Sequence, residues 1–355
     1  MIFEGKTVLV TGGTGSFGKV FVKRVLSGEQ GTPKKLIVLS RDEAKQNDMR
    51  IDYMKKTVAT DEIIYRNFMN VLEFRIGDIR NYSDVCSSMK HADIVVNAAA
   101  LKQVPACEYF PGQAILTNCM GPSNIVRAIT ENNYPVETVA GISTDKACKP
   151  INVMGMTKAL QERILTSANV LNSKTRFICV RYGNVLASRG SVIPLFHEQI
   201  KHGGPVTLTV KEMTRFLLSL DQAVNTVFAA IRHAKRGETY IPIAPAALVT
   251  DIAKALIGKR KIEVKLIGIR PGEKLSEILV SEEEIHHCFK RGDYYVIAPM
   301  LPELLDKTPL PKMALEKEYS SGDNVLDYEG TLSLMKKHDL MVKKGQLQEE
   351  GEMLK

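Results

Sequence analysis

The chain has 355 residues, of which 44% are hydrophobic and 25% are charged. This is the composition of an ordinary globular protein, and it excludes disordered, collagen-like and coiled-coil sequences. The net charge of +8 fits nucleic acid, an anionic membrane surface or a phosphorylated small molecule as a partner, and charge alone does not choose among them. At this length we expect one large domain with a smaller one appended.

The sequence predicts a cytoplasmic protein with reduced thiols. Its six cysteines are spread singly, without a Cys-x-x-Cys pair, and none of the seven histidines falls in a motif, so a metal site has no support. Residues 1–6 run into an apolar segment without the features of a leader. The longest apolar runs, such as 93–101, are about half of the roughly 20 residues that cross a bilayer, so we expect no membrane span.

Six short apolar runs alternate with helix-like segments in the first half of the chain. They lack the polar alternation of a half-exposed strand, as expected when helices cover both faces of a parallel sheet. The runs are 7–10, 35–39, 72–76, 93–97, 136–142 and 176–181. The sequence therefore predicts an α/β fold with a doubly wound parallel sheet of the Rossmann type.

From about residue 187 the pattern changes to short strands, loops and isolated helices. Segments of this kind lie at 206–210, 221–233 and 249–257. We expect a discontinuous Rossmann domain and a smaller α/β substrate-binding lobe, followed by a C-terminal extension whose last ten or so residues fray. The expected bounds are 1–186 and 217–248 for the first domain, 187–216 and 249–300 for the lobe, and 301–355 for the extension.

A glycine-rich segment, Thr11-Gly-Gly-Thr-Gly-Ser-Phe-Gly18, follows the first predicted strand. Glycine permits the tight turn, the close approach of the backbone to a diphosphate and the tight packing of the following helix, whose N-terminal amides face the anion. Because the segment follows a strand, opens a helix and heads a βαβ series, we interpret it as a dinucleotide-binding loop.

The end of the second predicted strand, Ser40-Arg41-Asp42, bears on the choice of cofactor. An acidic side chain there binds the ribose diol of NAD, whereas a hydroxyl followed by arginine can bind the additional phosphate of NADP. We predict NADP, and Asp42 keeps NAD as the alternative. The arginine could instead form a surface ion pair with the acidic residues that follow it. Asp78 is placed either to meet the adenine or to cap the helix that starts near residue 82.

Asp145 and Lys146 follow the fifth predicted strand, at the edge where such folds place their chemistry. Adjacent side chains of a regular strand face opposite ways, so both reach one substrate only if the strand has ended. The alternative is an exposed ion pair of little consequence. Met154 and Lys158 share a helix face, at the spacing that holds a tyrosine and a lysine in short-chain dehydrogenases. A thioether has no proton to exchange, so the usual base is missing.

Together, these motifs resemble those of the soluble bacterial UDP-N-acetylglucosamine 4,6-dehydratases that invert carbon 5, which are extended short-chain dehydrogenases. The resemblance runs from residue 1 to about 300 and continues weakly through 318–324. The matching segments are 11–18, 98–105, 143–147, 152–155, 181–185, 188–194, 213–216 and 270–274. Methionine at position 154 is similar to the branch that leads towards N-acetyl-L-fucosamine precursors.

The resemblance implies a tightly held NADP that is reduced and reoxidised in each turnover. Hydride leaves carbon 4 of the sugar, water is lost across carbons 5 and 6, and the hydride returns to carbon 6. The product is a 4-keto-6-deoxy sugar nucleotide, inverted at carbon 5. By this resemblance Lys146 is the base at carbon 5, Asp145 is the acid at the carbon 6 hydroxyl, and Lys158 clamps the nicotinamide ribose. Either Lys146 or a water chain accepts the carbon 4 hydroxyl proton, because Met154 cannot.

The resemblance also assigns binding residues. For the cofactor these are Thr11, Gly12, Thr14, Gly15, Ser16, Phe17, Gly18, Ser40, Arg41, Lys45, Asp78, Ile79, Ala98, Ala99, Ala100, Lys102, Asn118 and Lys158, with Thr117 beside Asn118. For the sugar nucleotide they are Lys102, Asn184, Arg189, Val192, Arg215, Arg270 and Glu273, where arginines meet the diphosphate and the carboxylate meets the uridine ribose. Residues 254–274 contain seven Lys or Arg against two Glu, which a diphosphate substrate would explain, although residues 259–261 fit a solvated basic face better.

The expected partner is therefore a UDP-sugar and not nucleic acid. By analogy, we also expect a homo-oligomer, with a hexamer as one form. Two other functions stay open. A nucleotide-sugar 4-epimerase would normally need the tyrosine that Met154 replaces, and a non-catalytic NADP-binding redox sensor would not need the Asp145–Lys146 pair.

Overall fold

The computed structural model describes residues 1–55, 61–186, 191–305 and 309–342. The chain forms two compact units, each built from three segments. The first unit comprises Met1–Tyr182, Leu220–Ile243 and Leu279–Glu318, and the second comprises the segments that begin at Gly183, Ala244 and Tyr319. Among the described residues, no helix combines the length and the apolar character needed to span a bilayer.

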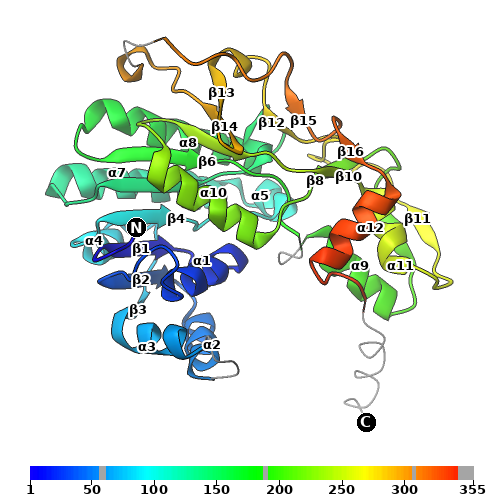
Figure 1. Cartoon of the computed structure of the whole chain (residues 1–355), viewed down its shortest axis with the longest axis horizontal. Helices are drawn as coiled ribbons and strands as arrows, with labels where there is room; N and C mark the ends of the chain where they lie inside the picture. Colours follow the sequence, from blue (N-terminus) through cyan, green and yellow to red (C-terminus); the bar gives the residue numbers. More distant parts are fainter. Residues whose placement is uncertain (56–60, 187–190, 306–308, 343–355) are drawn as a thin grey trace. The chain divides into compact units, whose positions relative to one another are not determined.

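The first unit is built on a nine-stranded sheet with the order β13-β14-β9-β6-β5-β4-β1-β2-β3 (Figure 1). The seven strands from β9 to β3 are parallel, and β14 and β13 extend the sheet in antiparallel fashion. Their bounds are β1 (Thr7–Thr11), β2 (Lys35–Ser40), β3 (Leu72–Ile76), β4 (Ile94–Asn97), β5 (Thr138–Ile142), β6 (Arg176–Val180), β9 (Thr239–Pro242), β13 (Cys288–Arg291) and β14 (Tyr294–Ile297). The predicted doubly wound parallel sheet is confirmed, including all six strands expected in the first half.

Helices cover both faces of this sheet. The helices and helical turns of the first unit are α1 (Ser16–Leu26), α2 (Glu43–Met54), α3 (Asp61–Val71), α4 (Tyr82–Met89), α5 (Val104–Tyr109), α6 (Pro111–Ile115), the π-helical turn η1 (Leu116–Met120), α7 (Gly121–Asn132), the 3₁₀ turn η2 (Asp145–Ala147), α8 (Val153–Leu171), α10 (Leu220–His233), and the 3₁₀ turns η3 (Ile285–His287) and η4 (Pro302–Leu304). Local sequence sets several ends: the Asn152 side chain accepts a hydrogen bond from the Gly155 amide at 2.8 Å and starts α8, and Asn133 ends α7 in the left-handed conformation.

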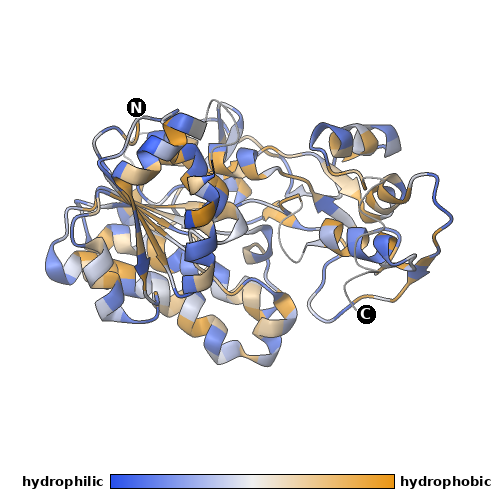
Figure 2. Cartoon of the chain, turned by 90° about the horizontal axis from the view of Figure 1, so that it is seen from below, coloured by the Kyte–Doolittle hydropathy of each residue, from blue (hydrophilic) through white to orange (hydrophobic). Residues whose placement is uncertain are grey.

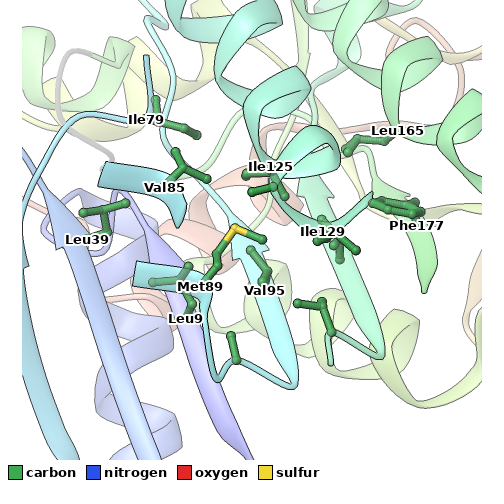
Figure 3. Close-up of a cluster of buried hydrophobic side chains, with 14 of the residues drawn as sticks. Leu9, Leu39, Ile79, Val85, Met89, Val95, Ile125, Ile129, Leu165 and Phe177 are labelled. Carbon is green, nitrogen blue, oxygen red and sulfur yellow. The ribbon is translucent and has the colours of Figure 1, made fainter. Parts of the chain in front are cut away.

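A core of the first unit lies between the sheet and α4, α7 and α8. Strand residues such as Leu9 and Val95 pack there against Met89, Ile125 and Leu165 of the helices (Figure 3). On the opposite face, α1 and α10 pack together, with the rings of Phe21 and Phe228 tilted against each other at a centroid distance of 5.7 Å. Phe3, which precedes β1, makes edge contacts with both rings. Figure 2 shows apolar colouring concentrated on the central strands, whereas the covering helices carry both apolar and polar residues. Burying the strands on both faces explains their continuous apolar runs.

The second unit has a core of its own. Strand β7 (Val206–Leu208) pairs with β11 (Val264–Leu266). Strand β10 (Ala246–Leu248) pairs with β8 (Thr214–Phe216) on one side and with β16 (Val325–Leu326) on the other. The helices are α9 (Val192–Lys201), α11 (Val249–Ile257) and α12 (Tyr328–Lys337). The helices bury Phe196, Leu256 and Met335 in one cluster. Two further short strands are β12 (Ile278–Val280) and β15 (Tyr319–Ser320).

The structure divides the chain differently from the expected bounds. The first unit ends a few residues earlier than expected, at Tyr182 and Ile243, and resumes at Leu220, so residues 244–248, with β10, belong to the second unit. Residues 279–300, expected in the substrate lobe, belong to the first unit because β13 and β14 continue its sheet from β9. The expected separate extension is shared between the units, because its α12 packs on α11 of the second unit. The expected fraying of the last ten residues concerns positions outside the described residues.

Candidate active site

The loops that follow four neighbouring strands leave the sheet at one edge. Strand register pairs Thr11 of β1 with Asn97 of β4, and Asn97 with Gly141 of β5. Because adjacent strands lie about 4.8 Å apart, the ends of β1 and β5 are separated by roughly 10 Å. The chain order reverses between β1 and β4, and ligands of open α/β sheets bind at such a switch point.

The glycine loop after β1 has the shape of an anion cradle. Gly12 has φ 67°, and a Cβ added there would lie 2.8 Å from the Cα atom of Ala99. A Cβ at Gly18 would lie 2.4 Å from Gly13, so α1 begins directly against the loop. Gly15 is the N-cap, and no side chain caps α1. Larger residues would fill this space, and the helix N-terminus favours a negative charge. The loop therefore fits the diphosphate of a dinucleotide.

The aromatic ring of Phe17, at the start of α1, stacks on Tyr182 at a centroid distance of 6.3 Å. Tyr182 follows β6, and its backbone carbonyl accepts a hydrogen bond from the amide of Asp145 at 3.0 Å. Burial raises the pKa of the Tyr182 hydroxyl, so it stays protonated. Sequence reasoning did not single out Tyr182, although it lies in the 181–185 motif.

The tip of β2 carries the residues expected to choose the cofactor. Ser40 Oγ lies 2.9 Å from Thr14 Oγ1 of the glycine loop, and Asp42 caps α2 by accepting a hydrogen bond from the Lys45 amide at 3.0 Å. The Arg41 guanidinium is half exposed and lies 3.6 Å from the Asp78 carboxylate. The Thr14 hydroxyl, the Arg41 guanidinium and the Asp78 carboxylate thus lie close to the end of β2.

Of the two roles considered for Asp78, the structure excludes that of a helix cap. Burial opposes its ionisation, but hydrogen bonds from Arg80 and the charge of Arg41 outweigh this effect and lower its pKa. It does not cap α4, because Asn81 is the N-cap and accepts the amide hydrogen bond of Ser83 at 3.0 Å. The side chain of the neighbouring Ile79 is buried in the core between the sheet and α4, α7 and α8, and its assignment to the cofactor stays a prediction.

The loop after β4 is held at both ends. The amides of Ala98 and Ala99 donate to the backbone and hydroxyl oxygens of Thr11, both at 3.2 Å. Ala100 follows them, and the side chain of Lys102 is exposed. Asn118, buried in the η1 turn, bonds both backbone polar groups of Leu101 at 2.8 and 3.0 Å and the Thr157 hydroxyl of α8 at 3.0 Å. Asn118 thus positions this loop against α8.

Asp145 and Lys146 lie in the 3₁₀ turn η2, after β5 has ended. The Lys146 ammonium lies 3.1 Å from the Asp145 carboxylate. The Asp145 side chain is 1% exposed, and the Lys146 side chain is 21% exposed. The Thr144 hydroxyl also donates to the same carboxylate oxygen, at 2.8 Å. The pair is therefore not the exposed surface ion pair that was the alternative.

Lys158 is buried on α8 beside the end of β5. Its ammonium donates to the carbonyl of Ile142 and to Gln161 Oε1, the latter at 2.7 Å. Burial lowers the pKa of Lys158 to about 8, although the charge of Glu162 opposes this shift. Met154, on the same helix, packs in a small apolar cluster with Cys107 and Ala114. The position that usually supplies a tyrosine proton shuttle is thus a packing position here.

A buried ionic network lies behind the turn and was not anticipated. Arg181, which follows β6, is bonded by Glu162 of α8 at 2.6 Å and by Glu284 at 2.8 Å. Glu162 also accepts a hydrogen bond from Ser143 at the end of β5. Arg181 lies in the 181–185 segment, one of those that carry the family resemblance. No sequence signal, however, identified its acidic partners.

The residues expected to hold the sugar nucleotide belong mostly to the second unit. Arg215 is buried and donates to the carbonyls of Thr214 and Leu275, at 2.7 and 3.2 Å, and its expected contact with the diphosphate stays a prediction. Glu273 accepts hydrogen bonds from the Thr209 hydroxyl and the Arg270 amide, both at 3.3 Å.

Other residues expected to bind the sugar nucleotide lie in two different segments of the second unit. The Arg270 side chain is exposed. Asn184 accepts a backbone hydrogen bond from Leu218 at 3.1 Å, and Val192 is the first residue of α9. Arg189 lies outside the described residues. The structure therefore gathers the expected cofactor and proton-transfer residues in the first unit and most of the expected sugar-nucleotide residues in the second.

Comparison with known proteins places this site in a family. Residues 8–299 match the family described as "Polysaccharide biosynthesis protein". A protein named UDP-glucose 4-epimerase from Rickettsia canadensis is 44% identical over 301 residues, covering 83% of this chain and 84% of its own. The X-ray structure of Pen from Bacillus thuringiensis is similar, with a TM-score of 0.85 and 35% identity over 96% of this chain and 100% of that one.

A more distant structure has the same fold. DesIV from Streptomyces venezuelae, described as dTDP-glucose 4,6-dehydratase with NAD and TYD bound, has a TM-score of 0.65 and 19% identity over 76% of this chain and 86% of its own. The resemblance inferred from the motifs is confirmed at the level of the family and its fold. The chain belongs to the polysaccharide biosynthesis protein family, within the extended short-chain dehydrogenases/reductases that comprise nucleotide-sugar epimerases and dehydratases.

Proposed function

We propose that the protein is a cytoplasmic UDP-N-acetylglucosamine 4,6-dehydratase that inverts carbon 5 and supplies a precursor for surface polysaccharide or glycan synthesis. The observation that carries this proposal is the Asp145–Lys146 pair, 3.1 Å apart, in the turn after β5. Dehydration across carbons 5 and 6 needs both a base and an acid on one sugar ring. A bound nicotinamide cofactor would supply the hydride transfer, from carbon 4 and back to carbon 6.

The two side chains have complementary tasks in this reaction. Lys146, as a neutral amine, removes the proton on carbon 5, and Asp145, in its protonated form, gives a proton to the departing carbon 6 hydroxyl. Because the two groups lie in contact, their protonation states are coupled, and the proton they share belongs to the pair.

Met154 supports dehydration over simple epimerisation at carbon 4. A 4-epimerase of this fold normally uses a tyrosine at this position and has no use for an acid at carbon 6. The packing of Met154 against Cys107 and Ala114 leaves it a purely apolar role. In our proposal Lys146 or a water chain therefore takes the proton of the carbon 4 hydroxyl.

A nucleotide-sugar 4-epimerase is the second candidate, because the R. canadensis relative, 44% identical, is named UDP-glucose 4-epimerase. Mass spectrometry of UDP-N-acetylglucosamine incubated with purified protein separates the two. We expect a product lighter by one water, and NMR of the reaction in deuterated water should show exchange and inversion at carbon 5. An unchanged mass with a new carbon 4 configuration would establish the epimerase, and no conversion of UDP-N-acetylglucosamine at all would favour the non-catalytic redox sensor.

We further propose that the cofactor is NADP, with NAD as the alternative recorded for the distant relative DesIV. The support is the half-exposed Arg41 beside Ser40 at the tip of β2. The additional phosphate that distinguishes NADP from NAD could bind there to a cation and a hydroxyl. Replacing Arg41 with alanine should weaken NADP binding by about tenfold, the scale of one charge-assisted contact, and leave NAD binding nearly unchanged. Calorimetric titration with both nucleotides measures this, and equal losses for both would assign the protein to NAD.

We also propose that the protein forms a homo-oligomer through α6, η1 and α8, which pack on one another. These elements expose apolar side chains that a soluble monomer rarely leaves in water: Ile115, Leu116, Met120, Met156 and Leu160 are 42–52% exposed. The occupant we assign is a second copy of the chain. The variant Leu160→Glu should lower the mass measured by light scattering to that of a monomer, whereas Leu171→Glu, at the far end of α8, should not.

A further inference from the structure

The backbone directly after the Asp145–Lys146 turn adopts an uncommon conformation. Lys149 has φ 44°, in the left-handed region. Among the described residues, the other non-glycine residues with positive φ are Asn133, Asn324 and Asp339. Asparagine and aspartate tolerate this region through local hydrogen bonds, whereas a lysine adopts it at a cost. Its surroundings must therefore hold Lys149 in this conformation.

Two carboxylates hold the Lys149 side chain. Its ammonium lies 2.7 Å from Glu318 and 3.6 Å from Glu282. The hydrogen bond to Glu318 raises the pKa of Lys149, although burial opposes this shift, so the Lys149 ammonium stays charged at neutral pH. Both carboxylates come from the Leu279–Glu318 segment of the first unit. The ion pair thus ties the end of the turn to a residue 169 positions later in the chain.

The rest of the turn is also restrained on both sides. The Cys148 thiol donates to Glu284, at 3.6 Å. Glu284 belongs to the same Leu279–Glu318 segment, called the late segment below. On the other side, α8 packs against the turn so closely that a Cβ at Gly155 would lie 2.2 Å from the Lys146 carbonyl oxygen. The direction of the chain at Lys149 therefore decides where the backbone of Lys146 sits between these two contacts.

We propose that Lys149 is a positioning residue, whose left-handed backbone, held by the ion pair with Glu318, keeps the Lys146 ammonium against Asp145. The inference rests on the proposed function of that pair. Without the ion pair, Lys149 relaxes towards a backbone conformation that lysine prefers, and the turn shifts. The late segment, which the sequence placed outside the cofactor domain, then acts on the proton-transfer residues through a single ion pair.

The variants Lys149→Ala and Glu318→Gln test the proposal by steady-state kinetics. Each should lower kcat by roughly tenfold to a hundredfold, the effect of small misplacements of reacting groups, with unchanged KM for UDP-N-acetylglucosamine and unchanged affinity for NADP. Adding Lys149→Gly to Glu318→Gln should restore most of kcat, because glycine adopts positive φ without the ion pair. Asn133→Ala is the matched control: it strains a left-handed residue at the end of α7 and should lower Tm without changing kcat.

A second measurement does not depend on turnover. Trace acetylation of Lys146 with acetic anhydride over a range of pH, read by mass spectrometry, reports the environment of its amine. The profile should shift in Lys149→Ala and Glu318→Gln and return in the Glu318→Gln/Lys149→Gly double variant. If the wild type converts no UDP-sugar but the profile shifts in this way, the proposed function fails and the positioning role stands. Unchanged kcat and profile in Lys149→Ala, or a loss that glycine does not rescue, would overturn the role of the Lys149 backbone.

Discussion

Replacing Lys146 with alanine is expected to abolish dehydration of UDP-N-acetylglucosamine while leaving the cofactor bound. The lysine lies in the turn after β5, whereas the glycine loop after β1 and the buried Lys158 provide the expected cofactor contacts. A positioned base contributes about a hundredfold to ten-thousandfold in rate, so kcat should fall by at least about a hundredfold. Product formation is followed by mass spectrometry and bound nucleotide by its release on denaturation.

Two further variants make this test specific. Lys90→Ala removes an exposed lysine at the end of α4 and should leave kcat unchanged. Asp145→Asn keeps the shape of the acid but not its proton. It should slow the loss of water while the carbon 5 proton still exchanges with deuterated solvent. Normal turnover by Lys146→Ala would show that another group performs the proton transfer, and the role assigned to the pair would be wrong.

The largest expected effect on stability is that of Arg181→Met. Arg181 is 3% exposed and carries the only positive charge between Glu162 and Glu284 in the described network. Removing one partner of a buried ionic group leaves uncompensated charge and typically costs about 3–5 kcal/mol. We expect a loss of this size in the free energy of unfolding, measured by urea denaturation at pH 7. Arg127→Met, which removes an arginine from an exposed pair with Glu131, is the matched control and should have little effect.

The pH dependence of the two proteins should differ in sign. In the wild type, burial opposes the ionisation of Glu284, but Arg181 outweighs this and lowers its pKa from 4.5 to about 2. Its contribution to stability is therefore complete above pH 4.5 and is lost as the pH falls towards 2. In Arg181→Met the hydrogen bonds from the Ser281 amide and the Cys148 thiol still favour the charged form, but burial is the largest effect on Glu284. The pKa of Glu284 should therefore rise above its ordinary value, and stability should fall as the pH rises through it. The gap between the two proteins should thus narrow from pH 7 to pH 5. A gap that stays constant would show that the lost stability comes from packing and not from charge.

A feature of the site could be predicted from the sequence when the residues that form it lie close together along the chain. The glycine loop was recognisable because the turn, the strand before it and the helix after it are all written within some twenty residues. The chemical meaning of Met154 was also local, because its spacing to Lys158 places both residues on one helix face. The surroundings of Arg215 were not local in the same way: its motif is written in residues 213–216, whereas one of the carbonyls that its guanidinium bonds belongs to Leu275, sixty residues later.

The fold class and the edge of the sheet that carries the chemistry were determined by the sequence alone. Strands buried on both faces must be continuously apolar, and loops at the carboxyl ends of parallel strands must meet at one edge. Only the tertiary structure decided that residues 279–318 complete the first unit and that Glu284 and Glu318 hold the segment around Asp145 and Lys146. An acidic residue looks the same in the sequence whether it faces solvent or a buried arginine, and its partner is chosen by packing between segments more than a hundred residues apart.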